Sequence, residues 1–179
     1  MKKLIIASLA LILTGCGTTS NLKNSKEPTM QLKLHDYNTV IVNDFTDGVT
    51  KEKNDPKIKT QGKIFADMIA NDLLSKKSFA SIERNAERCD HAILIDGEIT
   101  EYKEGNATAR LLIGLGAGSS HFDATVNIRD YTSKELLGVI KVDKMSWGLG
   151  GALAAIQDVT SHMKSSSEKI STQISNSKK

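Results

Sequence analysis

The 179-residue chain has little of what most catalytic or metal-binding sites are built from. It contains two cysteines, two prolines and one tryptophan, and aromatic residues make up only 4% of it. Its four histidines are scattered, without the HxxxH spacing of a helical metal site. No serine lies in a GxSxG sequence, and no glycine run matches a nucleotide-binding motif. The sequence therefore predicts a non-enzymatic protein without a metal ion or cofactor.

The longest apolar segment lies close to the N-terminus, where residues 4–13 follow Met1-Lys2-Lys3. This segment is too short for a transmembrane helix, which needs about 20 apolar residues. A basic start, a short apolar stretch and a small residue before Cys16 are typical of a cleaved targeting segment. We therefore expect residues 1–15 to be a signal peptide that is removed and is not part of the fold.

The residues around this cleavage site, Leu13-Thr14-Gly15-Cys16, resemble the lipobox of bacterial lipoproteins. That resemblance implies cleavage between Gly15 and Cys16 and a lipid-modified Cys16 whose several acyl chains form a stable membrane anchor. The residue after Cys16 is Gly17 and not an aspartate, which in such lipoproteins implies an outer-membrane location with the domain in the periplasm. The alternative interpretation is an ordinary secreted protein whose signal peptide happens to contain a cysteine.

The chain after the signal peptide is almost neutral and has a single thiol. Loss of Lys2 and Lys3 leaves 22 of the 24 basic residues against 21 acidic ones. Charge therefore gives no reason to expect nucleic acid as a partner. With Cys16 lipidated, Cys89 has no cysteine with which to pair. We expect Cys89 to be a buried small hydrophobe, the alternative being a reactive or intermolecular thiol.

Polarity and periodicity divide the remaining chain into a tether and one domain. Residues 16–36 are polar and aperiodic, which predicts a lipidated flexible tether, and residues 37–175 form the predicted α/β domain. The predicted class is α+β, a mixed α/β fold in which two main helices pack on a mostly antiparallel sheet in the order β-α-β-β-β-β-α. The expected strands cover 39–45, 79–83, 91–100, 121–129 and 136–144, a loop covers 46–59, and the helices start near 61 and 153.

The stretch 99–130 holds the densest glycine cluster and the clearest alternation of the chain. Gly114, Gly116 and Gly118 fall on one face of an extended segment, and 121–129 alternates as a half-buried strand. A phosphate-binding loop would open a helix, whereas this glycine run leads into a strand. The pattern therefore predicts a long β-hairpin whose glycine face packs against a copy of the protein, another partner, lipid or the C-terminal helix.

Two sequence blocks carry a family resemblance. Residues 96–106 with 109–118, and residues 142–151, resemble the domain-of-unknown-function 4410 family of bacterial lipoproteins, and the likeness covers most of 36–174. That family implies a compartment and a fold but no activity. More distantly, residues 40–45, Gly97 with Tyr102, and 109–117 are similar to the CsgG-like curli-secretion lipoproteins, in which a periplasmic α/β domain carries barrel-forming hairpins. On that comparison 103–122 takes the place of one pore-forming hairpin, and too few residues lie between Val142 and the C-terminal helix for a second.

These patterns predict an outer-membrane-anchored lipoprotein whose periplasmic domain binds other envelope proteins or copies of itself. An oligomeric pore or secretion-channel component related to curli-type export is the alternative. A third hypothesis, a small-molecule-binding or hydrolytic domain, would use Arg110, His121 or Asp123. The expected interface residues are Arg110, Gly114, Gly116, Gly118 and Trp147, of which Trp147 is either an interface anchor or a cap of the core.

Overall fold

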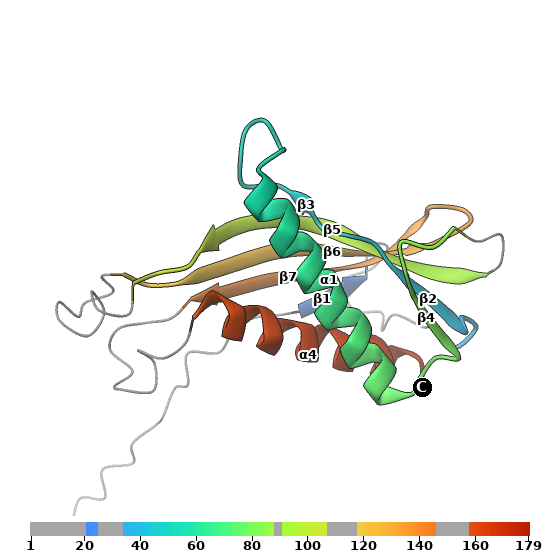
Figure 1. Ribbon diagram of the computed structural model, residues 1–179. Coiled ribbons are helices and arrows are strands. Elements are labelled where there is room, and N and C mark those ends of the chain that lie inside the picture. The colour runs from blue at the N-terminus through green and yellow to red at the C-terminus, as the bar shows by residue number, and fades with distance from the viewer. Residues whose placement is uncertain (1–20, 25–33, 88–90, 107–117, 146–157) are drawn as a thin grey trace, which may run out of the picture.

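The computed structural model describes residues 21–24, 34–87, 91–106, 118–145 and 158–179 (Figure 1). Within these ranges seven strands and two helices form two layers, a sheet and a helical layer. The fold class predicted from periodicity is confirmed. None of the described helices is both long enough and apolar enough to cross a bilayer.

The sheet has two halves that differ in the direction of their strands. In one half β1 (Asn21–Asn24), β7 (Leu136–Met145), β6 (His121–Asp130) and β5 (Ala92–Lys103) are antiparallel neighbours. In the other half β5, β2 (Thr39–Val42) and β4 (Ser81–Arg84) run parallel, and the short β3 (Thr46–Asp47) also pairs with β5. A parallel pair needs a crossover connection, and the helix α1 (Pro56–Lys76) supplies it between β2 and β4.

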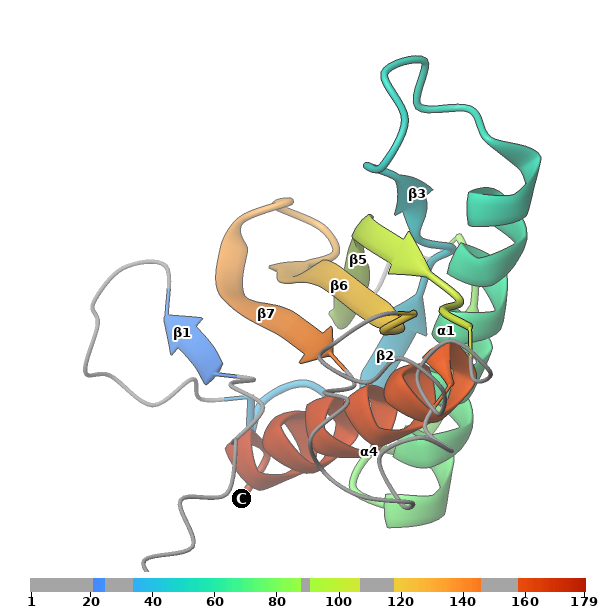
Figure 2. The ribbon, with the colours of Figure 1, turned by 90° about the vertical axis from the view of Figure 1, so that its left-hand side faces the viewer.

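Both helices lie on the same face of the sheet (Figure 2). α1 contacts mainly the parallel half, whereas α4 (Val159–Ser177) contacts β6 and β7 of the antiparallel half. Three phenylalanines join the layers, because the Phe65 ring lies edge-to-face with Phe45 at 5.0 Å and with Phe122 at 4.8 Å between ring centroids. The predicted alternation of β6 is confirmed, since its inward residues are all buried: Phe122, Ala124, Val126 and Ile128.

α1 begins earlier than the sequence pattern indicated. The expected loop 46–59 contains β3 and the first turn of the helix, and the Asp55 side chain caps that turn by accepting the N–H groups of Lys57 and Ile58. Aspartate followed by proline at the first helical position is a recognised start signal. The extra turn buries Ile58, whereas Ile64, expected on the buried stripe, is 38% exposed.

Part of the predicted tether 16–36 belongs to the folded domain. Asn21–Asn24 form β1, in which Asn21 lies opposite Lys141 of β7. Leu34 is fully buried, and its N–H donates to the Ser177 carbonyl at the end of α4 over 2.8 Å. A polar segment without periodicity still forms an edge strand because backbone hydrogen bonds hold it. The domain therefore starts before residue 37.

Candidate functional site

The predicted hairpin of 99–130 is present at its base. β5 and β6 stay paired as far as Lys103 opposite His121. Beyond that pair, the Asn106 N–H donates to the Gly118 carbonyl over 2.8 Å. Gly118 has a φ of 70°, a left-handed conformation that side chains disfavour. The two arms therefore remain together as far as residues 106 and 118.

Most residues singled out by the sequence lie outside the described part of the chain. These are Gly15, Cys16, Cys89, Arg110, Gly114, Gly116 and Trp147. Of the other candidates, His121 and Asp123 lie on the face of β6 that points away from the helices. An Asp123 carboxylate oxygen accepts the Lys144 backbone N–H over 3.3 Å, and burial raises the pKa of Asp123. The structure thus places His121 and Asp123 on one face at the start of β6, with Gly118 three residues before His121.

A hollow of about 400 Å³ lies beside the hairpin base, between α1 and the start of α4. Lys57 contacts two residues of its lining: the Lys57 Nζ lies 2.9 Å from Glu104 Oε1 and 5.7 Å from the centre of the Tyr102 ring. Burial raises the pKa of the Tyr102 hydroxyl, and the negative charges of Glu104 and Asp158 add to this effect. The hollow therefore combines apolar and acidic surface; its lining includes Gln61, Ile64, Tyr102, Glu104, Asp158 and Thr160.

The fold also brings together a serine and a histidine that the sequence did not connect. Ser120 Oγ lies 3.0 Å from His162 Nε2, although the residues are 42 positions apart. Both are buried, with exposed fractions of 0% and 4%. Because both side chains lie in the interior, this contact ties the start of β6 to the first turns of α4 and does not present a nucleophile to a substrate.

The face of the sheet opposite the helices carries a polar hollow of about 440 Å³. Within it, Asp96 accepts hydrogen bonds from Asn127 at 2.9 Å and from Arg129 Nε at 3.2 Å. No group of three potential metal ligands occurs among the described residues. In this hollow the Asp96 carboxylate is thus paired with Asn127 and Arg129. The hollow is lined by Asn43, Asp44, Thr46, Asp96, Gly97, Glu98, Thr125 and Asn127.

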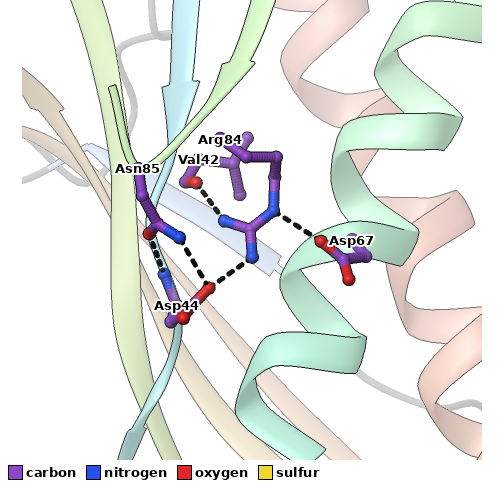
Figure 3. A network of polar contacts seen from close by, with 5 residues as sticks. All are labelled: Val42, Asp44, Asp67, Arg84 and Asn85. Carbon is purple, nitrogen blue, oxygen red and sulfur yellow. Dashed lines mark hydrogen bonds and ion pairs between the residues drawn. The ribbon is translucent and has the colours of Figure 1, made fainter. Parts of the chain in front are cut away.

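Arg84 at the end of β4 is surrounded by acceptors (Figure 3). Its Nε donates to Asp67 of α1 over 2.7 Å, and its other nitrogens contact the Val42 carbonyl and the Asp44 carboxylate. Asn85 also donates to Asp44, over 3.1 Å. Although burial acts to raise it, the pKa of Asp44 is lowered by the hydrogen bonds from Asn85 and Arg84. This network joins β4, β2 and α1.

Lys144 near the end of β7 is a basic residue in a different environment. It is only 7% exposed, and its Nζ donates to Ser165 Oγ of α4 over 3.3 Å, with Lys169 beside it. Burial, and then the neighbouring Lys169 charge, lower the pKa of Lys144 to about 8. The ion pairs found within the described ranges include neither lysine. Lys144 therefore faces another cation, whereas Arg84 faces carboxylates.

The arrangement of strands and helices is similar to that of several solved structures. The PelC dodecamer from Paraburkholderia phytofirmans matches with a TM-score of 0.53 and 15% identity, over 87% of this chain and 97% of the PelC chain. A DUF330 protein from Xanthomonas campestris matches with a TM-score of 0.43 and 10% identity, over 77% of this chain and 84% of its own. A putative neuraminyllactose-binding hemagglutinin homolog from Helicobacter pylori gives 0.42 and 10%, over 84% and 87%.

At the level of sequence, no curated protein matches the chain significantly. A family model does match, and it is described as a domain of unknown function (DUF4410). The match covers residues 23–150, which include every described strand except the first two residues of β1, together with α1 and the hairpin. Because it spans well over half of the sequence, the chain belongs to the DUF4410 family.

Proposed function

We propose that this chain is an outer-membrane lipoprotein, anchored through Cys16, whose periplasmic domain works by binding copies of itself or other envelope proteins. The observation that carries the proposal is the base of the hairpin. Its arms are paired up to Asn106 and Gly118, and beside them lies a hollow whose lining includes the exposed Ile64 and the half-buried Tyr102. Apolar and aromatic surface at such a position favours contact with a partner.

Two further observations support parts of this proposal. The sequence from Met1 to Cys16 has the order of a lipoprotein signal, which supports the anchor. PelC, which has a similar fold, is a dodecamer, and this supports self-association as the form of binding. Contact between copies through the hairpins is therefore the arrangement that we favour.

The anchor is tested by mass spectrometry of the N-terminal peptide from the protein made in its own cells. We expect a chain that begins with acylated Cys16 and fractionates with the outer membrane. Cys16→Ser should abolish both the acyl mass and the membrane association. An unmodified Cys16 within an otherwise cleaved, soluble protein would refute the anchor.

The interaction is tested by photo-crosslinking in intact cells from position 119, next to Gly118. We expect adducts between copies that form a ladder ending at a fixed size. A crosslinker at Thr132, in the exposed turn between β6 and β7 at the opposite end of the strands, is the matched control and should give few adducts. Adducts with one envelope protein alone would replace self-association by binding of that partner, and no adducts at all would refute the proposal.

A second candidate is an oligomeric pore or secretion-channel component related to the CsgG-like lipoproteins. The hairpin base favours it, because β5 ends at Lys103 and β6 begins at His121, close to the limits 103–122 that the family resemblance gives for a pore-forming hairpin. Release of a dye from liposomes by the purified lipidated chain tests this candidate. Channel activity of the wild type that is lost in Gly118→Val, which disturbs the left-handed backbone at the hairpin base, would favour the pore over the binding domain.

A further inference from the structure

Two lysines without a counter-charge lie side by side where β7 contacts α4. The buried Lys144 extends from the sheet to Ser165 of α4. Lys169, one helical turn after Ser165, lies beside the Lys144 ammonium group. Lys169 is exposed, so it forms the outer rim of the group. Two ammonium groups and one hydroxyl therefore meet where a buried position opens to solvent.

The nearby carboxylates do not balance this charge. Asp143 precedes Lys144 in the strand and is exposed on the opposite face of the sheet. Asp123 accepts the backbone N–H of Lys144 and not its ammonium group. Glu168 is exposed and forms none of the ion pairs within the described ranges. The ammonium groups of Lys144 and Lys169 are thus left facing each other.

An anion placed between these two lysines would remove the repulsion. A buried cation is costly unless it is paired, and a second cation nearby increases that cost. Phosphate oxygens accept charge-assisted hydrogen bonds from several donors at once, and lysine binds phosphate as a point charge. Two ammonium groups and a hydroxyl, all of them donors, fit a phosphate group better than a single carboxylate.

The position of the group relative to the N-terminus indicates where such a phosphate comes from. Asn21, where the chain enters β1, lies opposite Lys141, three residues before Lys144 on β7. Three strand residues span about 10 Å. Cys16 is five residues before Asn21, and five residues span at most about 18 Å. A lipid anchor at Cys16 would therefore hold this edge of the domain near the phospholipid headgroups.

We infer that Lys144, Lys169 and Ser165 form a binding site for a phosphate group, supplied by the headgroup of a membrane phospholipid. The lipid source rests on the proposed anchoring through Cys16. The phosphate site itself does not, because it is defined by β7 and α4 alone.

The test measures thermal unfolding of the full lipidated chain in nonionic detergent at pH 7. Inorganic phosphate is titrated against chloride at matched ionic strength, and short-chain phosphatidylglycerol is titrated in parallel. Binding to the folded state raises the unfolding midpoint with ligand concentration. We expect Lys144→Met and Lys169→Met each to weaken both apparent affinities by about tenfold or more. Lys169 lies on the exposed rim, so its substitution leaves the fold intact.

The matched control is Lys141→Met, which removes an exposed lysine from the other face of the same strand. It should change the affinities by less than about twofold. Tighter binding of phosphatidylglycerol than of inorganic phosphate would support the headgroup as the source, and the reverse order would overturn that source. Equal binding by wild type and both lysine variants, or an equal loss in Lys141→Met, would overturn the site. Mass spectrometry of Cys16 tests the anchor separately, because inorganic phosphate binds whether or not Cys16 is acylated.

Discussion

Arg84 and Lys144 are two basic side chains that point from the sheet toward the helical layer. Arg84 contacts α1, and Lys144 contacts α4. Arg84 meets Asp67 of α1 and Asp44, and its charge is compensated. Lys144 meets Ser165 and Lys169 of α4, and its charge is not compensated. The first arrangement braces the fold. The second costs stability, as expected of a position kept for a ligand and not for packing.

The inward faces of the two helices differ in the same sense. α1 buries Phe65, Ile69 and Leu73, which are large and apolar. α4 buries Ser166, Ser167, Ser171 and Ser175 beside its apolar residues. The Ser166 hydroxyl donates to the His162 carbonyl one turn earlier, over 2.8 Å, and Ser167 reaches Asp72 of α1 over 2.6 Å. Hydrophobic burial therefore stabilises the α1 side more strongly than the α4 side.

The largest effect is expected from Phe65→Ala, which removes the central ring of the phenylalanine cluster. We expect a loss of about 3–5 kcal/mol in the free energy of unfolding, from lost burial and an internal cavity. The comparison variant is Ser171→Ala under α4, where the hydroxyl bonds to its own helix, and the expected change is below about 1 kcal/mol. Chemical denaturation of both variants measures the difference, and equal losses would contradict the contrast between the helices.

Replacing the two cations by methionine should change stability in opposite directions. Arg84→Met removes the cation that faces Asp67 and Asp44 and leaves Asp44 with its hydrogen bond from Asn85. We expect a loss of about 1–2 kcal/mol, limited by the partial exposure of these carboxylates. Lys144→Met removes an unpaired buried charge at similar volume, and we expect a gain of about 1–3 kcal/mol in phosphate-free buffer. Destabilisation by both substitutions would show that Lys144 is also a structural brace.

The pH dependence of stability should carry the signature of Lys144. Its pKa is about 8 in the folded state and 10.5 ordinarily, so between these values the unfolded chain binds more protons than the folded one. The free energy of unfolding therefore gains a contribution that rises with pH from 8 to 10.5, by about 1–3 kcal/mol. Denaturation curves of wild type minus Lys144→Met isolate this contribution. Arg84→Met should retain it, and a flat difference curve would place Lys144 in a solvated environment.

The smallest effects are expected at the helix caps, where the two sides are alike. Asp55 accepts backbone N–H groups at the start of α1, and Asp158 accepts the Ser161 N–H over 2.7 Å at the start of α4. Asp55→Ala and Asp158→Ala should each cost about 0.5–2 kcal/mol. Similar losses in urea denaturation would show that the helices differ in their buried faces and not in their ends, whereas a difference above about 2 kcal/mol would contradict this.

Periodic segments of the sequence were sufficient to predict most of the fold. The alternation in 121–129 and the stripe containing Phe65, Ile69 and Leu73 report burial directly, because side-chain direction repeats every two or 3.6 residues. β1 and β3 have no such signal, since backbone pairing alone defines these short strands. The start of α1 was signalled by Asp55-Pro56, which also fits a loop, and only the buried Ile58 distinguishes the two.

The polar sites were much less predictable. Arg84 and Asp67 are 17 residues apart, Lys144 and Ser165 are 21, and Ser120 and His162 are 42. Each pair joins a strand, or in the case of Ser120 the residue just before a strand, to a helix, so its geometry depends on how the two layers pack. The sequence did predict the hairpin, and its base is confirmed by the Asn106–Gly118 hydrogen bond.

β1 lies at the edge of the sheet, where it is hydrogen-bonded to β7. With Cys16 held in a membrane, tension would reach the sheet first at Asn21 and load the hydrogen bonds between β1 and β7. If β1 alone detached, the chain between Asn21 and the buried Leu34 could span at most about 45 Å when fully extended. Attachment or detachment of β1 would then set the distance between the domain and the membrane.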